Sequence, residues 1–176
     1  MGRTLFWIFL LASLPMVKGE TVSMKTFKLF FAGDVMTGRG VDQVLPHSSS
    51  PELHEPFIKD ARDYVELAKR KGAVIPQKVE PSYIWGDALK EWKRQSPNLK
   101  VINLETSVTM SDNYWEGKGI NYRMHPKNVD IFKAAKIDVM TLANNHVLDW
   151  GREGLKETVN TLKSADFSLA AAGKSL

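Results

Sequence analysis

The stretch TLANNHVLDWG, residues 141–151, decides how this chain is expected to fold. The apolar run 137–143 ends abruptly in Asn144, Asn145 and His146. Two carboxamides and an imidazole continue neither a buried strand nor an amphipathic helix, because both need apolar side chains at regular spacing. The pattern therefore predicts a buried strand that stops where its last side chains can bind a ligand.

Three further apolar runs have the same character. They cover residues 27–32, 100–104 and 167–170. Like the run that ends at residue 143, they show little alternation of polar and apolar side chains. Such runs are typical of strands buried on both faces, as in a parallel sheet.

Segments with helical periodicity separate these strands. Apolar side chains recur at helical spacing in residues 57–68, 84–92, 129–135 and 155–162. Ser82 is expected to cap the second of these helices. Strands that alternate with helices predict an α/β fold with right-handed crossovers. Residues 38–56 and 106–126 are rich in Ser, Pro, Gly, Asp and Asn, and we expect long loops there.

Polar groups follow three of the predicted strands. Asp34 follows the first, Glu105 the second, and Asn145 with His146 the third. In an open parallel sheet these groups would meet at the carboxyl edge, where such sheets bind ligands. Carboxylates, amide oxygens and imidazoles ligate divalent cations, and a cation relieves the repulsion between neighbouring carboxylates. Each group alone has a structural alternative as a turn or cap, but together they predict a metal-assisted site with His146 as ligand or general acid.

Composition excludes several classes of function. The chain has 176 residues, 43% of them hydrophobic, and no cysteine, which rules out disulfides, thiol nucleophiles and cysteine metal sites. The net charge is only +4, and basic residues are interleaved with acidic ones, as in KDARDYVELAKRK at 59–71. No basic stripe could follow a nucleic-acid backbone, so we expect no nucleic-acid partner.

Residues 1–23 have the pattern of a secretory signal peptide. Arg3 precedes the unbroken apolar run 5–12, and small residues near Gly19 could form a cleavage site. The run is too short to predict a membrane-spanning helix. We therefore expect an exported or envelope-associated protein. The alternatives are an uncleaved anchor, or an N-terminal extension of a cytoplasmic chain that starts at Met24.

Four motifs, in this order along the chain, resemble the capsule-synthesis CapA family: GDVMTGR at 33–39, NLETSVT at 103–109, NYRMHP at 121–126 and LANNHVLDWG at 142–151. AAAGKSL at 170–176 resembles the next segment of that family. The family is named for poly-γ-glutamate capsule production and is related to the calcineurin-like metallophosphoesterases. The resemblance implies that residues 24–176 form the amino-terminal half of a metallophosphoesterase-like domain, a partial layered α/β sheet with flanking helices. A truncated sheet of this kind would leave an unpaired edge and an uncovered apolar face.

The same resemblance implies roles for the residues at the strand ends. Asp34 would be a metal ligand, and Glu105 would take the position of a bridging aspartate. Asn145 would be an amide ligand of the metal. His146 would contact the oxyanion or the leaving group of the substrate.

The sequence departs from the wider superfamily at two positions. Met36 stands where metallophosphoesterases have a histidine, and a thioether is a poor ligand for a hard cation. Asn144 stands where they have glycine. The other histidines follow no predicted strand: we expect His47 and His54 to be exposed in a polar loop, and His125 to lie at a helix start.

Two classes of function remain open. One is a hydrolase or transferase that uses Mn, Fe, Zn or Mg to act on poly-γ-glutamate or a phosphoester at the cell envelope. Substrate contacts are then expected from Arg39, Asn144 and Arg123, because a guanidinium pairs bidentately with a carboxylate. A solvated surface position is the alternative for both arginines, and it is the favoured one for Arg123. The other class is a non-catalytic component that binds or exports polymer with envelope capsule-synthesis proteins, or an inactive truncated fragment.

Overall fold

A four-stranded parallel sheet carries the fold in the computed structural model, which describes residues 25–171. Its strands are β1 (Leu29–Val35), β2 (Leu99–Leu104), β5 (Val139–Thr141) and β6 (Ser168–Ala170), in the spatial order β1-β2-β5-β6. Every neighbouring pair in this sheet is parallel. The four predicted strands and their parallel arrangement are confirmed. The predicted signal peptide, residues 1–23, lies outside the described residues.

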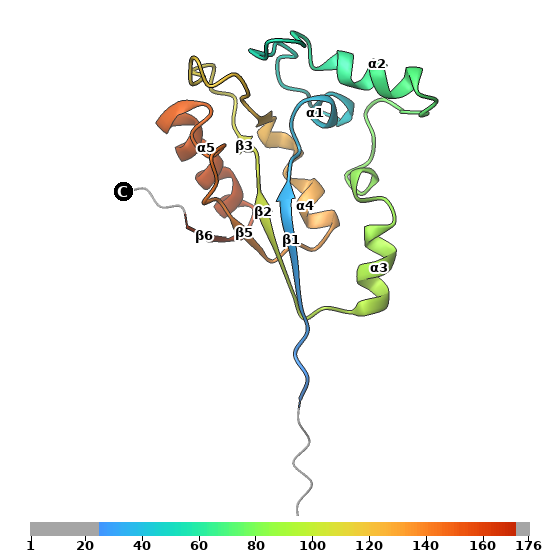
Figure 1. Ribbon diagram of the computed structural model, residues 1–176. Helices are drawn as coiled ribbons and strands as arrows, with labels where there is room; N and C mark the ends of the chain where they lie inside the picture. The colour runs from blue at the N-terminus through green and yellow to red at the C-terminus, as the bar shows by residue number, and fades with distance from the viewer. Residues whose placement is uncertain (1–24, 172–176) are drawn as a thin grey trace, which may run out of the picture.

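Helices connect the strands and extend from their ends. They are α1 (Gly40–Val44), α2 (Arg62–Arg70), η1 (Tyr83–Trp85), α3 (Ala88–Gln95), η2 (Pro126–Asn128), α4 (Asp130–Ala134) and α5 (Gly151–Ser164). Figure 1 shows α1 and α2 at the end of the molecule toward which β1 points. Across residues 25–171, no helix is both long enough and apolar enough to cross a membrane.

The predicted helices after Pro126 and Gly151 are confirmed, but the one expected over 84–92 is divided in two. Gly86 separates η1 from α3 and has a φ of 48°, which interrupts the helical path. Ser82 lies at the N-cap position of η1, although its side chain makes no capping hydrogen bond. The division therefore follows from the glycine.

The helix expected from Phe57 starts late, because α2 begins at Arg62. Phe57 is 95% exposed and contributes nothing to the core. The segment before α2 folds back on itself instead, and the Leu53 amide donates to the Lys59 carbonyl at 2.8 Å. Such backbone pairing in a loop overrides the local helical pattern.

Short elements occupy the two segments predicted to be long loops. Residues 38–56 include α1, and residues 106–126 contain β3 (Ser107–Val108) and β4 (Arg123–Met124), which pair in parallel as a second sheet. The expectation of loops was therefore wrong for these parts. Elements this short give no periodic pattern in the sequence.

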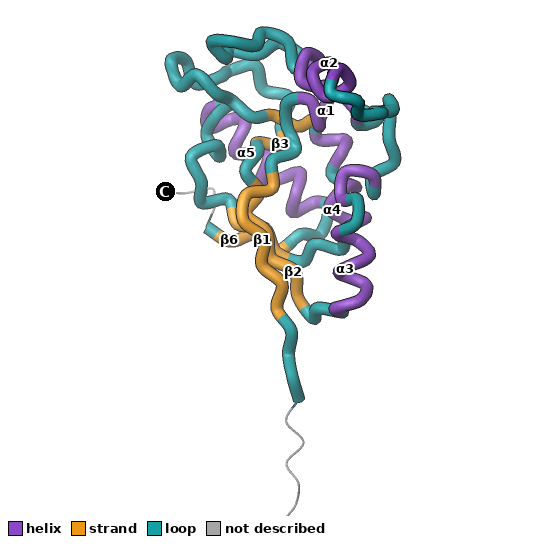
Figure 2. The backbone as a smooth tube through the Cα atoms, turned by 45° about the vertical axis from the view of Figure 1, so that its right-hand side comes forward, coloured by secondary structure: helices purple, strands orange, loops and turns teal. Residues whose placement is uncertain are grey.

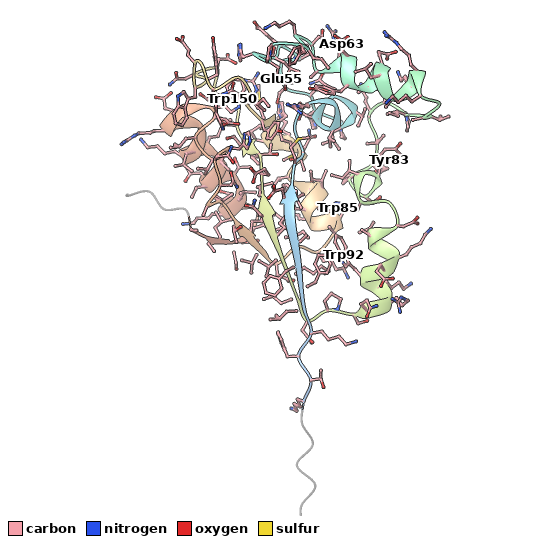
Figure 3. All side chains as sticks on the ribbon, viewed as in Figure 1. Glu55, Asp63, Tyr83, Trp85, Trp92 and Trp150 are labelled. Carbon is pink, nitrogen blue, oxygen red and sulfur yellow. The ribbon has the colours of Figure 1, made fainter. Side chains whose placement is uncertain are left out.

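The core lies between one face of the main sheet and the helices. Ile102 of β2 is fully buried there, and the ring of Phe30 meets Trp92 of α3 edge-on with centroids 5.2 Å apart. Figures 1 and 2 show α3 and α4 on the same side of β1 and β2. Trp85 and Trp92 lie between the helices and the sheet, with their rings 5.4 Å apart (Figure 3).

The opposite face of β1 is uncovered in the described part of the chain. Leu29 is 51% exposed and Phe31 is 67% exposed. The strand also forms an edge of the sheet. The predicted burial of this strand on both faces was therefore wrong, whereas the unpaired edge and apolar face expected of a partial sheet are present.

The buried carboxylate of Asp42 connects α1 by hydrogen bonds to the segments that contain Ser49 and His125. Asp42 Oδ2 accepts a hydrogen bond from the Ser49 amide at 2.6 Å, and Oδ1 accepts one from the His125 amide at 2.8 Å. Burial raises the pKa of Asp42 above its ordinary value of 3.8, although these hydrogen bonds oppose the shift. The folded state therefore holds this proton more tightly than the unfolded chain does.

We expect Asp42→Asn to lower the free energy of unfolding by about 1–3 kcal/mol at neutral pH, because an amide NH₂ would face backbone donors. The contribution of Asp42 is fully present below pH 3.8 and declines as the pH rises through its raised folded pKa. The difference in stability between wild type and variant should thus shrink across this range. Urea unfolding followed by circular dichroism at several pH values measures it, with exposed Asp63→Asn as the matched control. A difference that widens with pH would contradict the expectation.

Candidate functional site

The carboxyl ends of β1 and β2 bring two carboxylates onto one amide group. The pairing register shifts between Ala32 and Asp34, so that Asp34 lies opposite Asn103 of β2. Irregularities of this kind re-aim a side chain at the end of a strand. Asn103 Nδ2 donates to Asp34 Oδ1 at 2.8 Å and to Glu105 Oε2 at 2.6 Å. The predicted meeting of these two carboxylates is therefore observed.

Asn144, which follows β5, is hydrogen-bonded to Asn103 and to the end of β2. Its Nδ2 donates to Asn103 Oδ1 at 3.0 Å and to the Leu104 carbonyl at 2.9 Å. Its Oδ1 accepts from the His146 amide at 3.0 Å. Asn144 thus shapes the turn that places His146. The neighbouring Asn145 is exposed, and its backbone carbonyl accepts from Lys118 Nζ.

His146 lies between two carboxylates. Its Nε2 is 3.8 Å from Glu105 Oε1, and its Nδ1 is 2.6 Å from Asp149 Oδ2. A carboxylate can only accept, so we assign the proton of the neutral ring to Nδ1. The lone pair of Nε2 then faces Glu105. Tyr122 stacks on the imidazole ring of His146, with ring centroids 4.0 Å apart.

Asp149 holds this arrangement together and is fully buried. Besides His146, its carboxylate accepts from the Tyr122 amide at 2.6 Å and pairs with Lys118 Nζ. Lys118 Nζ also lies 3.2 Å from His146 Nδ1, but the shorter Asp149 contact decides the position of the ring proton. Lys118 reaches the site from a turn flanked by two glycines with positive φ, Gly117 at 73° and Gly119 at 83°.

Arg39 lies beside the site, but its charge is already paired. Its Nε donates to Glu55 Oε1 at 2.6 Å, and its guanidinium lies over the rings of Tyr64 and Tyr122, 5.0 and 4.8 Å from their centroids. The Tyr64 hydroxyl also donates to Glu55, at 2.6 Å. Burial and this hydrogen bond raise the pKa of Tyr64 to about 12.

Arg123 is buried, so the expected solvated surface position was wrong. Its Nη1 donates to the Ser111 carbonyl at 2.8 Å and to Asp112 Oδ1 at 2.9 Å. Its guanidinium lies 3.9 Å from the centroid of the Trp150 ring. The pairing of β4 with β3 buries this side chain in the protein. Strands of two residues have no periodic pattern, so the sequence did not predict the pairing.

The remaining histidines lie away from the two carboxylates. His47 is exposed, as predicted, whereas His54 is half-buried and stacks on Tyr114 with centroids 3.5 Å apart. His125 is the N-cap of η2 and its Nδ1 accepts from the Lys127 amide at 3.1 Å, which confirms its expected place at a helix start.

Sequence reasoning missed three residues of the site. Asn103 could have been noticed as a polar residue inside an apolar run, and Asp149 as a carboxylate three residues after His146. Lys118 gives no signal, because its partner lies 31 residues away.

The donor atoms at this edge fit a divalent cation only in part. Asp34 and Glu105 supply carboxylate oxygens, and His146 carries the carboxylate-bound imidazole typical of metal sites. Within residues 25–171, however, no group of three or more His, Asp or Glu side chains is placed to hold a metal ion. Met36 does not add a ligand, because its sulfur accepts from the Gly38 amide at 3.1 Å.

A parallel α/β sheet with flanking helices, and with carboxylates and an Asn-Asn-His turn at its carboxyl edge, defines a partial metallophosphoesterase-like layered fold. The chain belongs to the family described as bacterial capsule synthesis protein PGA_cap, which matches residues 28–176.

Named relatives agree with this assignment. The chain is 43% identical over 148 residues to a Mycobacterium tuberculosis protein named "probable polyglutamine synthesis accessory protein", an alignment that covers 84% of this chain and 39% of that protein. It is 27% identical over 166 residues to the PGA biosynthesis protein CapA of Bacillus subtilis, covering 90% of this chain and 35% of the relative. The capsule biosynthesis protein CapA of Bacillus anthracis is 36% identical over 91 residues, 47% of this chain and 22% of that protein. The chain thus spans well under half the length of these relatives.

Proposed function

We propose that the carboxyl edge of the sheet is a metal-assisted hydrolase or transferase site. Its substrate would be poly-γ-glutamate or a phosphoester at the cell envelope. The observation that carries the proposal is the meeting of Asp34 and Glu105 on one amide, with His146 Nε2 3.8 Å from Glu105. Both substrates are anionic, and two free carboxylates would repel them. A bound cation removes that repulsion.

Asp34 and Glu105 would hold the cation, which would be Mn, Fe, Zn or Mg, and the family resemblance implies the Asn145 amide as a further ligand. When bound, the cation would polarise the scissile group of the substrate and lower the pKa of a water molecule bound to it. His146 would accept or deliver a proton at Nε2. Asp149 keeps the ring oriented by accepting from Nδ1.

Metal content tests the proposal directly. We expect the wild-type chain to bind Mn²⁺ weakly, because its ligand set is partial, and Asp34→Asn with Glu105→Gln to lower the affinity roughly tenfold or more. Isothermal titration and elemental analysis of the purified chains measure this. Asp63→Asn with Glu153→Gln, which changes two exposed carboxylates elsewhere, is the matched control. Equal and negligible metal in all three proteins would remove the support for an enzyme.

Turnover provides a second, independent test. We expect this chain alone to hydrolyse bis-p-nitrophenyl phosphate slowly or not at all, because the described residues supply fewer than three charged or imidazole ligands in one group. The release of p-nitrophenol in the presence of Mn²⁺ measures the rate. Fast turnover that His146→Ala abolishes would show that the described residues suffice, and would overturn this expectation.

A non-catalytic role in binding or exporting polymer is the second candidate. It is favoured by the partial ligand set and by Arg39, whose charge is neutralised by Glu55. The relatives named as accessory and capsule biosynthesis proteins support association with synthesis machinery in either case. An envelope location for this chain is part of both proposals. Loss of Mn²⁺ binding in the double variant Asp34→Asn with Glu105→Gln would favour the enzymatic role over the non-catalytic one.

A further inference from the structure

A polar pocket lies next to the site at the carboxyl edge of the sheet, which we call the edge site. The lining of this pocket does not include Asp34, Glu105 or His146. It has a volume of about 470 Å³, within the range of ligand pockets, and lies between the loop of residues 52–59 and the loop of residues 114–121. These loops extend beyond the end of the sheet at which α1 and α2 lie (Figure 1). A ligand in this pocket could therefore be held beside the edge site without contacting it.

The pocket offers one open aromatic surface. Trp115 lines it and is 55% exposed, although an indole of this size is normally largely buried. The backbone holds this residue in place, because the Trp115 amide donates to the Asp149 carbonyl at 2.8 Å. The rings of His54 and Tyr114, which also line the pocket, are already stacked on each other. Trp115 is thus the aromatic surface left for a ligand.

Asn121 holds the backbone of the pocket wall in place. Asn121 is buried, and its Nδ2 donates to the carbonyls of Trp115 and Asp149 at 3.3 and 3.2 Å. Because both partners can only accept, the orientation of the amide is determined. Its Oδ1 has no hydrogen-bond partner among the residues of the described chain. The two hydrogen bonds of Nδ2 therefore join the backbone of Trp115 to that of Asp149 and fix the base of the Trp115 side chain.

The charges in the pocket do not favour an anion. Glu52 and Lys59 both line it and are both exposed, so that their charges offset each other. A polyglutamate chain or a nucleotide would gain attraction from Lys59 but repulsion from Glu52. A ring with an apolar face and hydroxyl donors uses every group present.

We infer that this pocket binds a neutral saccharide, with one ring stacked on Trp115 and its hydroxyls directed toward the exposed Glu52 and Lys59. The carbon-bound hydrogens of a sugar ring would cover the indole face. This binding goes beyond the proposed chemistry at Asp34 and Glu105 and does not depend on a metal.

Nuclear magnetic resonance of the Trp indole groups in the whole chain tests this inference, with the neutral trimer of N-acetylglucosamine as the probe. We expect its addition to shift the Trp115 indole signal, and Trp115→Ala to weaken binding roughly tenfold or more. Tyr83→Ala removes a similarly exposed aromatic ring that does not line this pocket, and should leave binding unchanged. Lys59→Gln should change the affinity by less than about twofold, because the ligand is neutral and the Gln amide can still donate a hydrogen bond.

Two comparison ligands make the test decisive. A γ-linked glutamate trimer and adenosine should leave the Trp115 signal unshifted at concentrations where the sugar trimer binds. Binding of either in place of the sugar would overturn the inference, as would a sugar trimer that shifts no Trp115 signal in a folded protein. Loss of Mn²⁺ binding in the Asp34 and Glu105 variant tests the edge site alone, so the two proposals fail independently.

Discussion

Phe132→Ala should lower the free energy of unfolding by about 3–5 kcal/mol. Phe132 of α4 is fully buried, and its ring meets Phe167 edge-on with centroids 6.1 Å apart. It also lies 6.4 Å from the ring of Trp85. The side chain therefore joins three segments that are distant in the sequence, and its loss leaves a cavity that they cannot all close.

Urea unfolding followed by circular dichroism and tryptophan fluorescence measures this loss, and coincidence of the two signals checks that unfolding is two-state. Phe57→Ala is the matched control, because it removes the same side chain from a position that is 95% exposed. We expect it to change the stability by less than about 0.5 kcal/mol. Similar losses for both variants would show that the Phe132 cluster does not stabilise the fold.

The parts of the fold that could be predicted from the sequence are those with a long enough periodic pattern. The apolar run that ends at Ala143 showed a parallel strand, and the spacing after Gly151 showed α5. The β3–β4 pair could not be predicted, because strands of two residues have no period. The exposure of Phe57 could not be predicted either, because the backbone pairing within residues 51–61 leaves no periodic pattern in the sequence.

The same limit applies to the candidate site. Asp34, Glu105 and His146 could be predicted because each follows an apolar run in the sequence, and parallel strands end at one edge. Lys118 could not, because a loop brings it to Asp149 from 31 residues away. The pairing of Arg39 with Glu55 was also hidden, since it depends on the position of α1 relative to the following loop. Strand topology is readable from a sequence, whereas ion pairs between loops are set by tertiary structure.

Asp149→Ala should have an effect as large as the loss of Phe132, about 3–5 kcal/mol in the free energy of unfolding, because it breaks a buried ion pair. The fully buried carboxylate pairs with Lys118 and accepts from His146 Nδ1 and the Tyr122 amide. Its removal leaves a cation and two N–H donors without their partner. Chemical denaturation measures the loss.

The double variant Lys118→Met with Asp149→Leu is the control that separates the pair from its parts, because replacing a buried pair with apolar groups costs less than breaking it. We expect the double variant to be more stable than Asp149→Ala. Nitrogen-15 chemical shifts of His146 should also change, because in the wild type the carboxylate keeps the ring proton on Nδ1. Asp149→Asn keeps an acceptor oxygen and should preserve the Nδ1–H signal better than Asp149→Ala. An unchanged His146 spectrum in Asp149→Ala would show that Tyr122 stacking alone orients the ring, and that Asp149 serves only the stability of the fold.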